Sequence, residues 1–463
     1  MSQIVAVILN SLKSNKSLLE AENDIMIKAS QLLTQAFSTA LEMLDQELCL
    51  GQDDLSVQHR DQRTIQLLCG SVSYRRRLVE KDDGSHGYLL DDFLGLRPRI
   101  RYSDLLIERV SQLASKGVLR SVAQAVSTLT PVSMSHQTVW KIVQVAGKKI
   151  DQVRQAEANY QDGEVAKRKQ LPVVFLEGDA FMIKSKGRPS KQLTVHRFQV
   201  YEGVEISGHR HRLLNRHVIS SLSHSEALKE LKAYLDQHYD LSQTKLITGS
   251  DNGSGYQQSV FDDIAGMAQS HQHMLDRYHL NRKIRTRLSL MPKALVNGLI
   301  KAIDHGHFDQ LPAYLDTAES LALDHETQED VRQLRAYLKR NWDSIRPLGD
   351  SKFAKVIHSL GSCESNHRHY TYRLKHQGRS WTKAGLSAML RVIDAQQNGN
   401  LPATLITRPE FAKPLSPTIP RLIPSLLRAN HEIHQGIRHG SITADTSYSS
   451  PVGHLAAIFN NSI

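Results

Sequence analysis

The sequence predicts an α/β fold with a mixed sheet at its centre and helical regions on either side of it. Residues 171–184 form a short apolar run rich in Val and Phe, which is typical of a buried strand. Four further strand-like runs follow at 193–201, 208–219, 245–251 and 270–276, with helical patterns at 223–238 and after residue 256. Residues 284–346 are almost wholly amphipathic, which predicts an all-helical insertion within the core.

Composition limits the classes of protein to which the chain can belong. Its 463 residues allow two to four domains, and a formal charge of +11 favours a polyanionic partner. No apolar run approaches the ~18 residues that span a bilayer, so we expect no membrane segment. Residues 4–9 lack the preceding positive charge of a signal peptide. The three cysteines form no CxxC pair, and a cytoplasmic protein is the expectation.

The N-terminal part divides into two regions. Residues 1–58 are helix-like, with apolar side chains near a helical period, and predict a packing or oligomerisation helix pair. Residues 59–102 predict a small β-rich region, with strands at 64–70 and 72–79 that turn at Gly70 and Ser71. Arg75, Arg76 and Arg77 lie together on the second strand. These arginines could contact phosphate groups, or they could simply be exposed to solvent.

Residues 103–155 predict a helix-turn-helix-like DNA-binding region. A helical pattern at 121–129 is followed by a polar break and a second helical pattern at 137–146, for which Ser135 is a good N-cap. The first turn of the second helix presents the residues suited to base edges and phosphates, namely His136, Gln137, Thr138 and Lys141. Such helix pairs also serve as structural elements. A polar linker at 152–170 leads to the core, whose first part spans 165–283.

Three acidic residues stand where chemistry could use them. Asp179 lies within the first core strand, Asp251 ends a later strand, and Glu364 lies near the start of a helix in the segment 347–398. A buried carboxylate is costly unless a basic side chain or a metal ion compensates it. A salt-bridged Asp179 is the alternative to a metal site. If the first and fourth strands are neighbours, Asp179 and Asp251 lie side by side, and a carboxylate from a later helix completes the group.

Divalent Mg²⁺ would relieve the repulsion within such a group, because it takes oxygen ligands and keeps positions open for water and phosphate. Two ions ~4 Å apart can serve phosphoryl transfer. Glycines at 249, 253 and 255 permit close backbone approach beside Asp251. Basic residues that follow Glu364 suit DNA near an acidic centre, namely Arg368, Arg373, Lys375, Arg379 and Lys383.

A second cluster competes with the acidic one. His271, His273, Asp276 and His279 have spacings that could bind zinc or manganese. Histidine is frequent throughout the chain, with 23 in all, which weakens any histidine cluster as a signal.

An ordered set of short runs resembles the ISLre-type family of bacterial insertion-sequence transposases, over roughly residues 60–395. These runs are Arg63-Thr-Ile with Gly70-Ser-Val-Ser-Tyr-Arg-Arg, Ser135-His-Gln-Thr-Val-Trp, Gly178-Asp179, Ser250-Asp-Asn-Gly-Ser-Gly-Tyr256, Leu275-Asp-Arg-Tyr-His-Leu280, and Glu364-Ser-Asn-His with Tyr372-Arg-Leu-Lys-His-Gln-Gly-Arg-Ser-Trp381. The resemblance implies a DDE transposase with an RNase H-like core that is interrupted by the helical insertion. Ala180 departs from the Gly that generally follows the first Asp, and the Pro- and Ser-rich tail at 399–463 matches no pattern.

By this resemblance, Asp179, Asp251 and Glu364 would be catalytic and would bind Mg²⁺ or Mn²⁺, with two ions expected. Asp276 and His279 resemble the Asp/Cys-x-x-His motif of the related Mutator-like transposases, which favours a structural or DNA-end role over a separate zinc site. The expected partners are the terminal inverted repeats and target DNA, bound by a homodimer or larger assembly at the nucleoid. The alternatives are an RNase H-like nuclease that does not join strands and a non-catalytic DNA-binding regulator.

Overall fold

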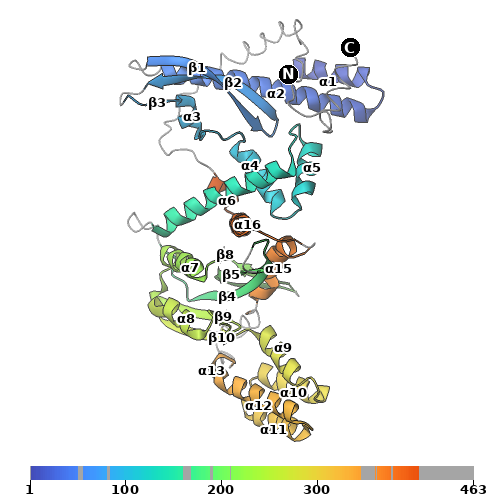
Figure 1. Ribbon diagram of the computed structural model, residues 1–463, viewed down its shortest axis with the longest axis vertical. Helices are drawn as coiled ribbons and strands as arrows, with labels where there is room; N and C mark the ends of the chain where they lie inside the picture. The colour runs from blue at the N-terminus through green and yellow to red at the C-terminus, as the bar shows by residue number, and fades with distance from the viewer. Residues whose placement is uncertain are drawn as a thin grey trace.

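The computed structural model describes residues 2–50, 56–80, 84–159, 168–187, 191–208, 210–345, 360, 362–376 and 379–405. Figure 1 shows an elongated molecule, with a helical hairpin and a small sheet at one end, a five-stranded sheet in the middle and a helical subdomain at the other end. The predicted α/β class with a mixed central sheet is confirmed. None of the described helices is long and apolar enough to cross a membrane.

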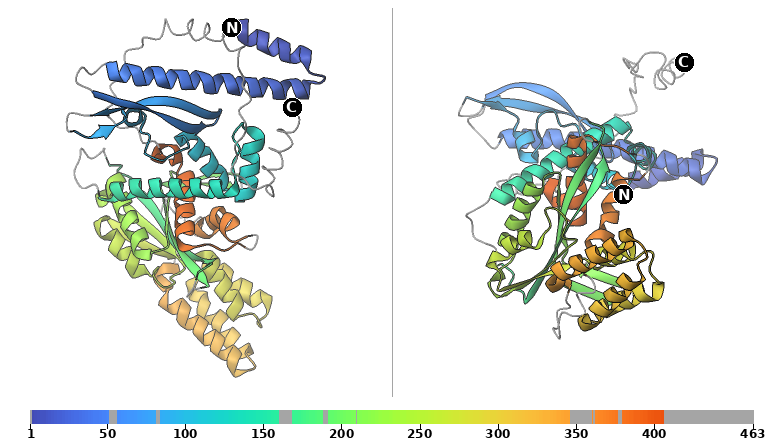
Figure 2. Two further views of the ribbon diagram at one scale, coloured as in Figure 1. Left: turned by 45° about the horizontal axis from the view of Figure 1, so that its top comes forward. Right: turned by 60° about the horizontal axis from the view of Figure 1, so that its bottom comes forward.

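The N-terminal end combines two helices with a three-stranded sheet. Its elements are α1 (Ser2–Ser14), α2 (Leu18–Leu50), β1 (Ser56–Leu67), β2 (Gly70–Glu80), β3 (His86–Gly87) and α3 (Leu89–Leu94). The predicted strand pair is confirmed, although β1 begins at Ser56, before its predicted start. The long helix α2 runs along this sheet, and α1 folds back beside it (Figure 2). Arg76 pairs with Asp91, and Arg77 lies 2.7 Å from Asp45, so these two arginines tie the helices to the sheet.

Three helices connect this end to the core. They are α4 (Asp104–Ala114), α5 (Leu119–Leu129) and α6 (His136–Asn159). The predicted succession of helix, polar break and helix is confirmed, and Ser135 caps α6 because its Oγ accepts from the Thr138 N–H at 3.2 Å. The helix α6 continues to Asn159, well into the predicted linker. Its later turns are held in place because Ile150 is buried and Arg154 pairs with Asp394 at 3.0 Å.

The central sheet has the strand order β10-β9-β4-β5-β8. Its strands are β4 (Val173–Lys184), β5 (Gln192–Tyr201), β8 (His217–Ser221), β9 (Lys245–Ser250) and β10 (Ser270–Leu275). Strand β5 pairs antiparallel with both β4 and β8, whereas β9 pairs parallel with β4 and β10 pairs parallel with β9. The strand that carries Asp179 is therefore a neighbour of the strand that Asp251 follows, which meets the condition set for placing the two aspartates side by side.

The segment 208–219 is not a single strand, which corrects the prediction. A hairpin of β6 (Gly203–Ser207) and β7 (Arg210–Leu214) leaves the sheet first, and β8 begins only after it. Asn215 has a φ of 48° at the point where the chain turns from β7 into β8. Asn is one of the few residues that adopt this left-handed conformation easily, so the turn breaks the apparent run.

Helices cover both faces of the sheet. On one face, α7 (His224–His238) and α8 (Gln258–Ile264) pack on β4 and β5 through a core that includes Leu176, Phe198, Leu231 and Phe261. On the other face lies α15 (Ser362–Leu374). The helices α16 (Lys383–Gln397) and α17 (Leu401–Leu405) pack against α6. Short 3₁₀ turns occur at Leu241–Gln243, Ala265–Met267 and Phe308–Gln310.

The region predicted as a helical insertion is all helical where the structure describes it, and it has its own hydrophobic core. It consists of α9 (Arg277–Arg287), α10 (Lys293–Asp304), α11 (Leu311–Leu321), α12 (His325–Arg340) and α13 (Trp342–Ile345). It starts at Arg277, directly after β10, because Asp276 caps α9 by accepting from the His279 N–H at 3.1 Å. Much of the predicted start of the segment 347–398 and most of the predicted tail, residues 406–463, lie outside the described residues.

The crossing of α6 and α16 is unusually close at Gly147. A Cβ atom built on Gly147 would lie 2.6 Å from the Cα of Ala388, so the two backbones approach within the space that a methyl group would need. This contact helps to fix the helical layer on the sheet.

We expect Gly147→Ala to lower the free energy of unfolding by about 1–3 kcal/mol, because the added methyl must displace backbone. That cost exceeds the ~1 kcal/mol gained in helix propensity. Thermal melting followed by circular dichroism measures the change. Gly266→Ala is the matched control, since a Cβ there meets nothing within 4 Å. An unchanged melting temperature for Gly147→Ala would contradict the close crossing.

Candidate active site

Three aspartates lie at the same level along three neighbouring parallel strands, with Asp179 in β4, Asp251 directly after β9 and Asp276 directly after β10. Glu177 pairs with Gly249, and Ser250 pairs with Leu275. Continuing this register by one or two residues sets Asp179 beside Asp251, and Asp251 beside Asp276. Neighbouring strands are about 4.8 Å apart, and residues in register on parallel strands point to the same face. The backbone positions of the three aspartates are therefore adjacent at the carboxyl edge of β4, β9 and β10.

Asp179 occupies a largely buried position without a cationic partner. Its side chain is 16% exposed, its Oδ1 accepts from the Ala180 N–H at 2.7 Å, and its Oδ2 lies 3.7 Å from Nδ1 of His367. Burial lowers the pKa of His367 to about 3, so that ring is neutral. Among the described residues, no lysine or arginine comes within 4.0 Å of Asp179, so the salt-bridge alternative finds no support.

The acidic neighbours act on Asp179 as the sequence predicts for clustered carboxylates. Burial and the negative charges of Asp251 and Asp276 raise the pKa of Asp179 to about 7, although the Ala180 N–H and His279 oppose this shift. A carboxylic acid with such a pKa loses its proton to solvent when a cation binds beside it and compensates the carboxylate charge. Asp179 could therefore serve as one ligand of a divalent metal ion.

The loop after β9 fixes the orientation of Asp251. The Asp251 Oδ1 accepts from the Gly253 N–H at 2.8 Å, and Asn252 between them has a φ of 55°. A Cβ on Gly253 would lie 2.8 Å from that same oxygen, so a larger residue would have to shift the Asp251 carboxylate. The glycine thus permits the close approach, as expected from the sequence.

A chain of hydrogen bonds supports this loop from β10 and from the helical insertion. The His273 Nδ1 is 2.8 Å from Thr248 Oγ1, and its Nε2 is 2.9 Å from Asn252 Oδ1. Burial lowers the pKa of His273 to about 4. The Asn252 side-chain amide donates to Asn341 Oδ1 at 2.9 Å, which joins the loop to the end of α12.

The competing histidine cluster does not converge on one point. His271 faces Asp262 at 2.8 Å, His273 faces Thr248 and Asn252, and Asp276 caps α9 beside the ring of His279, at 3.5 Å. In the described part of the chain, no three His, Cys, Asp or Glu side chains are grouped closely enough to hold a metal ion. That statement includes Asp179, Asp251 and Asp276, whereas the side chain of Glu364 lies outside what the structure describes.

A buried polar network fixes the start of α15 against the sheet. Glu177 accepts hydrogen bonds from the Tyr201 hydroxyl, the Ser362 hydroxyl and the Cys363 N–H, each at 2.8 Å. Arg197, fully buried, donates to the Cys363 carbonyl at 2.8 Å. Burial raises the pKa of Glu177 against the effect of its three donors. Glu364 follows Cys363 in the same helical turn, so the network sets its backbone beside the carboxyl edge.

Sequence reasoning missed Glu177 and Arg197. A signal was present, because both are charged residues within otherwise apolar strands and each lies on the same strand face as a polar residue two positions away, Asp179 and Gln199 respectively. The partners that satisfy them come from α15, about 165 to 185 residues further along the chain. Spacing along the sequence does not reveal such a pairing.

The predicted DNA-binding residues fall into two groups. His136, Gln137 and Lys141 are exposed on the first turns of α6, Thr138 is half-buried there, and Arg368 and Lys375 are exposed on or just after α15. Arg373 is different, and its prediction as a DNA contact is wrong for this structure. It is 2% exposed, its Nε donates to the Ala114 carbonyl at 2.6 Å, and its guanidinium lies 5.0 Å from the Trp381 ring centre.

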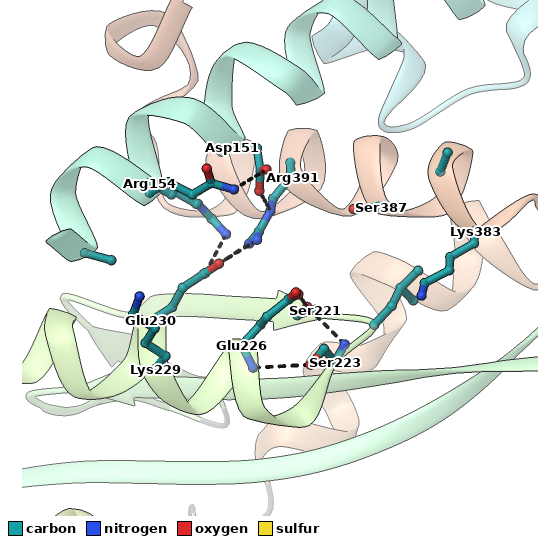
Figure 3. A pocket seen from close by; sticks show the side chains of 14 residues that line it. Asp151, Arg154, Ser221, Ser223, Glu226, Lys229, Glu230, Lys383, Ser387 and Arg391 are labelled. Atoms are coloured by element: carbon teal, nitrogen blue, oxygen red, sulfur yellow. Dashed lines mark hydrogen bonds and ion pairs between the residues drawn. The ribbon is translucent and has the colours of Figure 1, made fainter.

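A cavity of about 770 Å³ lies elsewhere, between α6, α7 and α16 (Figure 3). Several of its charged side chains pair with one another. Arg391 reaches Asp151 at 2.9 Å and Glu230 at 2.5 Å. These ion pairs join the three helices, so we assign the cavity a structural role rather than the chemistry of the acidic edge.

Comparison with known proteins places the chain in a family. The sequence pattern of the uncharacterised protein family UPF0236 matches residues 12–405. The chain belongs to this family. A UPF0236 protein in the vanSb 3′ region of Streptococcus gallolyticus is 33% identical over 455 residues, which cover 98% of this chain and 99% of that protein.

More distant UPF0236 relatives occur in Caldanaerobacter subterraneus subsp. tengcongensis. One is 22% identical over 351 residues, covering 74% of this chain and 69% of the relative. Another is 20% identical over 398 residues, covering 84% of this chain and 79% of the relative, and its name joins eleven TTE designations. None of these names states an activity.

We expect Glu177→Ala to destabilise the docking of α15. Removing the carboxylate takes away the acceptor that the Tyr201 hydroxyl, the Ser362 hydroxyl and the Cys363 N–H share, and each buried group left unsatisfied costs about 1–3 kcal/mol. Hydrogen exchange should speed up in the first turns of α15, and the melting temperature should fall. Glu205→Ala, an exposed change on the β6–β7 hairpin, serves as the control. Equal protection of α15 in both variants would show that the network does not hold this helix.

Proposed function

We propose that this protein is a DDE transposase of a bacterial insertion sequence with an RNase H-like catalytic core. The observation that carries the proposal is the carboxyl edge of the sheet, where Asp179 and Asp251 lie side by side. The helix that contains Glu364 is fixed across the same face by Glu177 and Arg197. No described cationic side chain neutralises Asp179.

The order of elements supports the proposed core. Three antiparallel strands are followed by a helix, a parallel strand that ends in Asp251, a second helix and another parallel strand. The helical insertion then separates β10 from α15. An RNase H-like core interrupted by a helical insertion would have this order, with its first two acids on adjacent strands and its third on a helix.

Asp179, Asp251 and Glu364 would hold Mg²⁺ or Mn²⁺, with two ions in the full site. The raised pKa of Asp179 supports this assignment, because carboxylates that repel one another gain most from a shared cation. When bound, the metal would supply an activated water and charge compensation for phosphoryl transfer. Asp276 caps α9, and with His279 it positions the start of the insertion beside the two aspartates.

Double-stranded DNA is the proposed partner, as terminal inverted repeats and as target. A formal charge of +11 supports a polyanionic ligand. The exposed first turns of α6, with His136, Gln137 and Lys141, would read the ends, while Arg368 and Lys375 would contact backbone near the acids. One relative has a name that joins eleven designations, as a gene present in several copies of one genome would have. Repetition of this kind is typical of a mobile element and supports the proposal.

Strand cleavage tests the proposal. The full chain with Mg²⁺ should cut DNA that carries the sequences flanking its gene, and Asp179→Asn, Asp251→Asn and Glu364→Gln should each lower the rate by roughly 10²-fold or more, the scale on which removing a group that stabilises charge in the transition state slows catalysis. Asp263→Asn is the control, because Asp263 is exposed and pairs with Lys232 at 2.5 Å away from the acids. Undiminished cleavage by the three variants would refute the assignment of the site.

Product analysis separates the alternatives. A transposase joins the freed 3′ end to target DNA, whereas a nuclease of the same fold yields cut products alone. A DNA-binding regulator would bind the ends without metal-dependent cutting. Binding should weaken steeply with salt in all three cases, because several phosphates are neutralised.

We further propose that the protein acts as a homodimer or larger assembly, with α2 as a contact between copies. Four large apolar residues on α2 follow a spacing of seven, seven and four, which is typical of a coiled-coil seam. They are Leu19, Met26, Leu33 and Phe37, exposed by 77%, 61%, 51% and 45%. An apolar stripe of this kind, unpartnered within the described chain, fits the same stripe of a second copy.

Leu33→Glu with Phe37→Glu should shift the mass measured by light scattering from the dimer to the monomer, because charges in the seam have no partner. The melting temperature should hardly change, since both side chains face solvent in one copy. Leu323→Glu, at a residue 97% exposed in the insertion, should leave the mass unchanged. A monomeric unaltered protein would refute this contact.

A further inference from the structure

The helical insertion carries an aromatic residue between two cations on the side that adjoins the sheet. Helices α9 and α12 pack together in the insertion (Figure 1). The half-buried ring of Tyr337 on α12 has Lys283 Nζ 3.8 Å from its centre and the guanidinium carbon of Arg340 5.9 Å away. Both cations are exposed. The three side chains form one surface, the Lys283–Tyr337–Arg340 surface.

This surface adjoins the acidic edge. Arg340 immediately precedes Asn341, whose side chain accepts from Asn252, the residue that follows Asp251. The Asn341 N–H also bonds the Tyr337 carbonyl at 3.1 Å. On α9, Lys283 is seven residues after the cap Asp276, so it lies two turns along the same side of the helix.

The pKa shifts of Lys283 and Tyr337 agree with a position of this surface near Asp251. Burial lowers the pKa of Lys283, and the charge of Asp251 opposes the shift. Burial and then Asp251 raise the pKa of Tyr337 to about 12. The charge of Asp251, one of the proposed catalytic aspartates, therefore acts on both side chains.

The cations of this surface differ from others on the same helices. Arg287 on α9 pairs with Asp330, and Arg335 on α12 lies 2.7 Å from Asp316. Within the described part of the chain, by contrast, neither Lys283 nor Arg340 has a carboxylate within 4.0 Å. The helix α9 also contains no acidic residue, whereas five of its eleven residues are Arg or Lys. This surface keeps its positive charge available to a ligand.

We propose that the Lys283–Tyr337–Arg340 surface binds the unpaired DNA strand at the cleaved end, next to the acidic site. A base would stack on Tyr337, and Lys283 and Arg340 would contact the flanking phosphates. Stacking on an exposed aromatic ring beside cations is the usual way in which proteins hold single-stranded nucleic acid without reading its sequence. The inference rests on the proposed function, because it names a subsite of that same site.

Fluorescence anisotropy of the full chain in EDTA tests the subsite without cleavage. Two labelled probes of the same end sequence are compared, a flush duplex and a duplex with a short single-stranded extension. The unaltered protein should bind the extended probe more tightly. Tyr337→Ala should lower the affinity for the extended probe about tenfold and leave the affinity for the flush duplex unchanged. Tyr337→Phe should bind both probes as tightly as the unaltered protein does.

With Lys283→Ala or Arg340→Ala, the affinity for the extended probe should depend less steeply on salt concentration. The change in slope should correspond to the loss of about one phosphate contact. Arg332→Ala is the matched control, because Arg332 is an exposed cation of α12 that already pairs with Glu319 at 3.5 Å. Melting temperatures confirm that each variant is folded.

The outcomes separate this inference from the proposed function. Equal affinities of Tyr337→Ala and the unaltered protein for the extended probe would overturn the subsite alone, while cleavage by the unaltered protein would still stand. No binding of either probe by the unaltered protein, together with no cleavage, would overturn the proposed function and the subsite with it.

Discussion

Parallel pairing of β4, β9 and β10 imposes the constraint on which the site depends, because it sets three aspartates at neighbouring positions along one edge of the sheet. Like charges at this spacing repel, so each needs a local compensation. Asp251 has the Gly253 N–H, and Asp276 has the first turn of α9. Among the described residues, Asp179 accepts from the Ala180 N–H and lies beside a neutral histidine, and its pKa rises to about 7. This uncompensated charge is the reason for which we propose that the edge binds a cation.

The rest of the core holds the edge that carries these aspartates in place. Glu177 and Arg197 are buried ionisable groups, which would be costly without their hydrogen bonds to α15. These hydrogen bonds fix the helix that contains Glu364 over the strand that contains Asp179. On the opposite side, the hydrogen bond from Asn252 to Asn341 fixes the insertion to the Asp251 loop. Sheet, helix and insertion therefore meet at the carboxylates.

Much of this arrangement follows from local patterns in the sequence. The strand-like runs at 171–184 and 245–251 predict two strands that bring their acids together if they are neighbours, and the sheet order shows that they are neighbours. What could not be predicted depends on contacts between distant segments. Arg373 is basic and lies in a basic stretch, yet Ala114 and Trp381 bury it. The hairpin before β8 was missed because a single Asn with positive φ interrupts an apparent strand.

Anomalous scattering from a crystal soaked in Mn²⁺ tests the central claim most directly, because it locates the metal without requiring DNA or activity. The account predicts a peak between Asp179 and Asp251 that disappears in Asp179→Asn, while the fold of the variant is unchanged. A well-folded crystal with no peak at these aspartates, or with its main peak among His271 and His273, would contradict it.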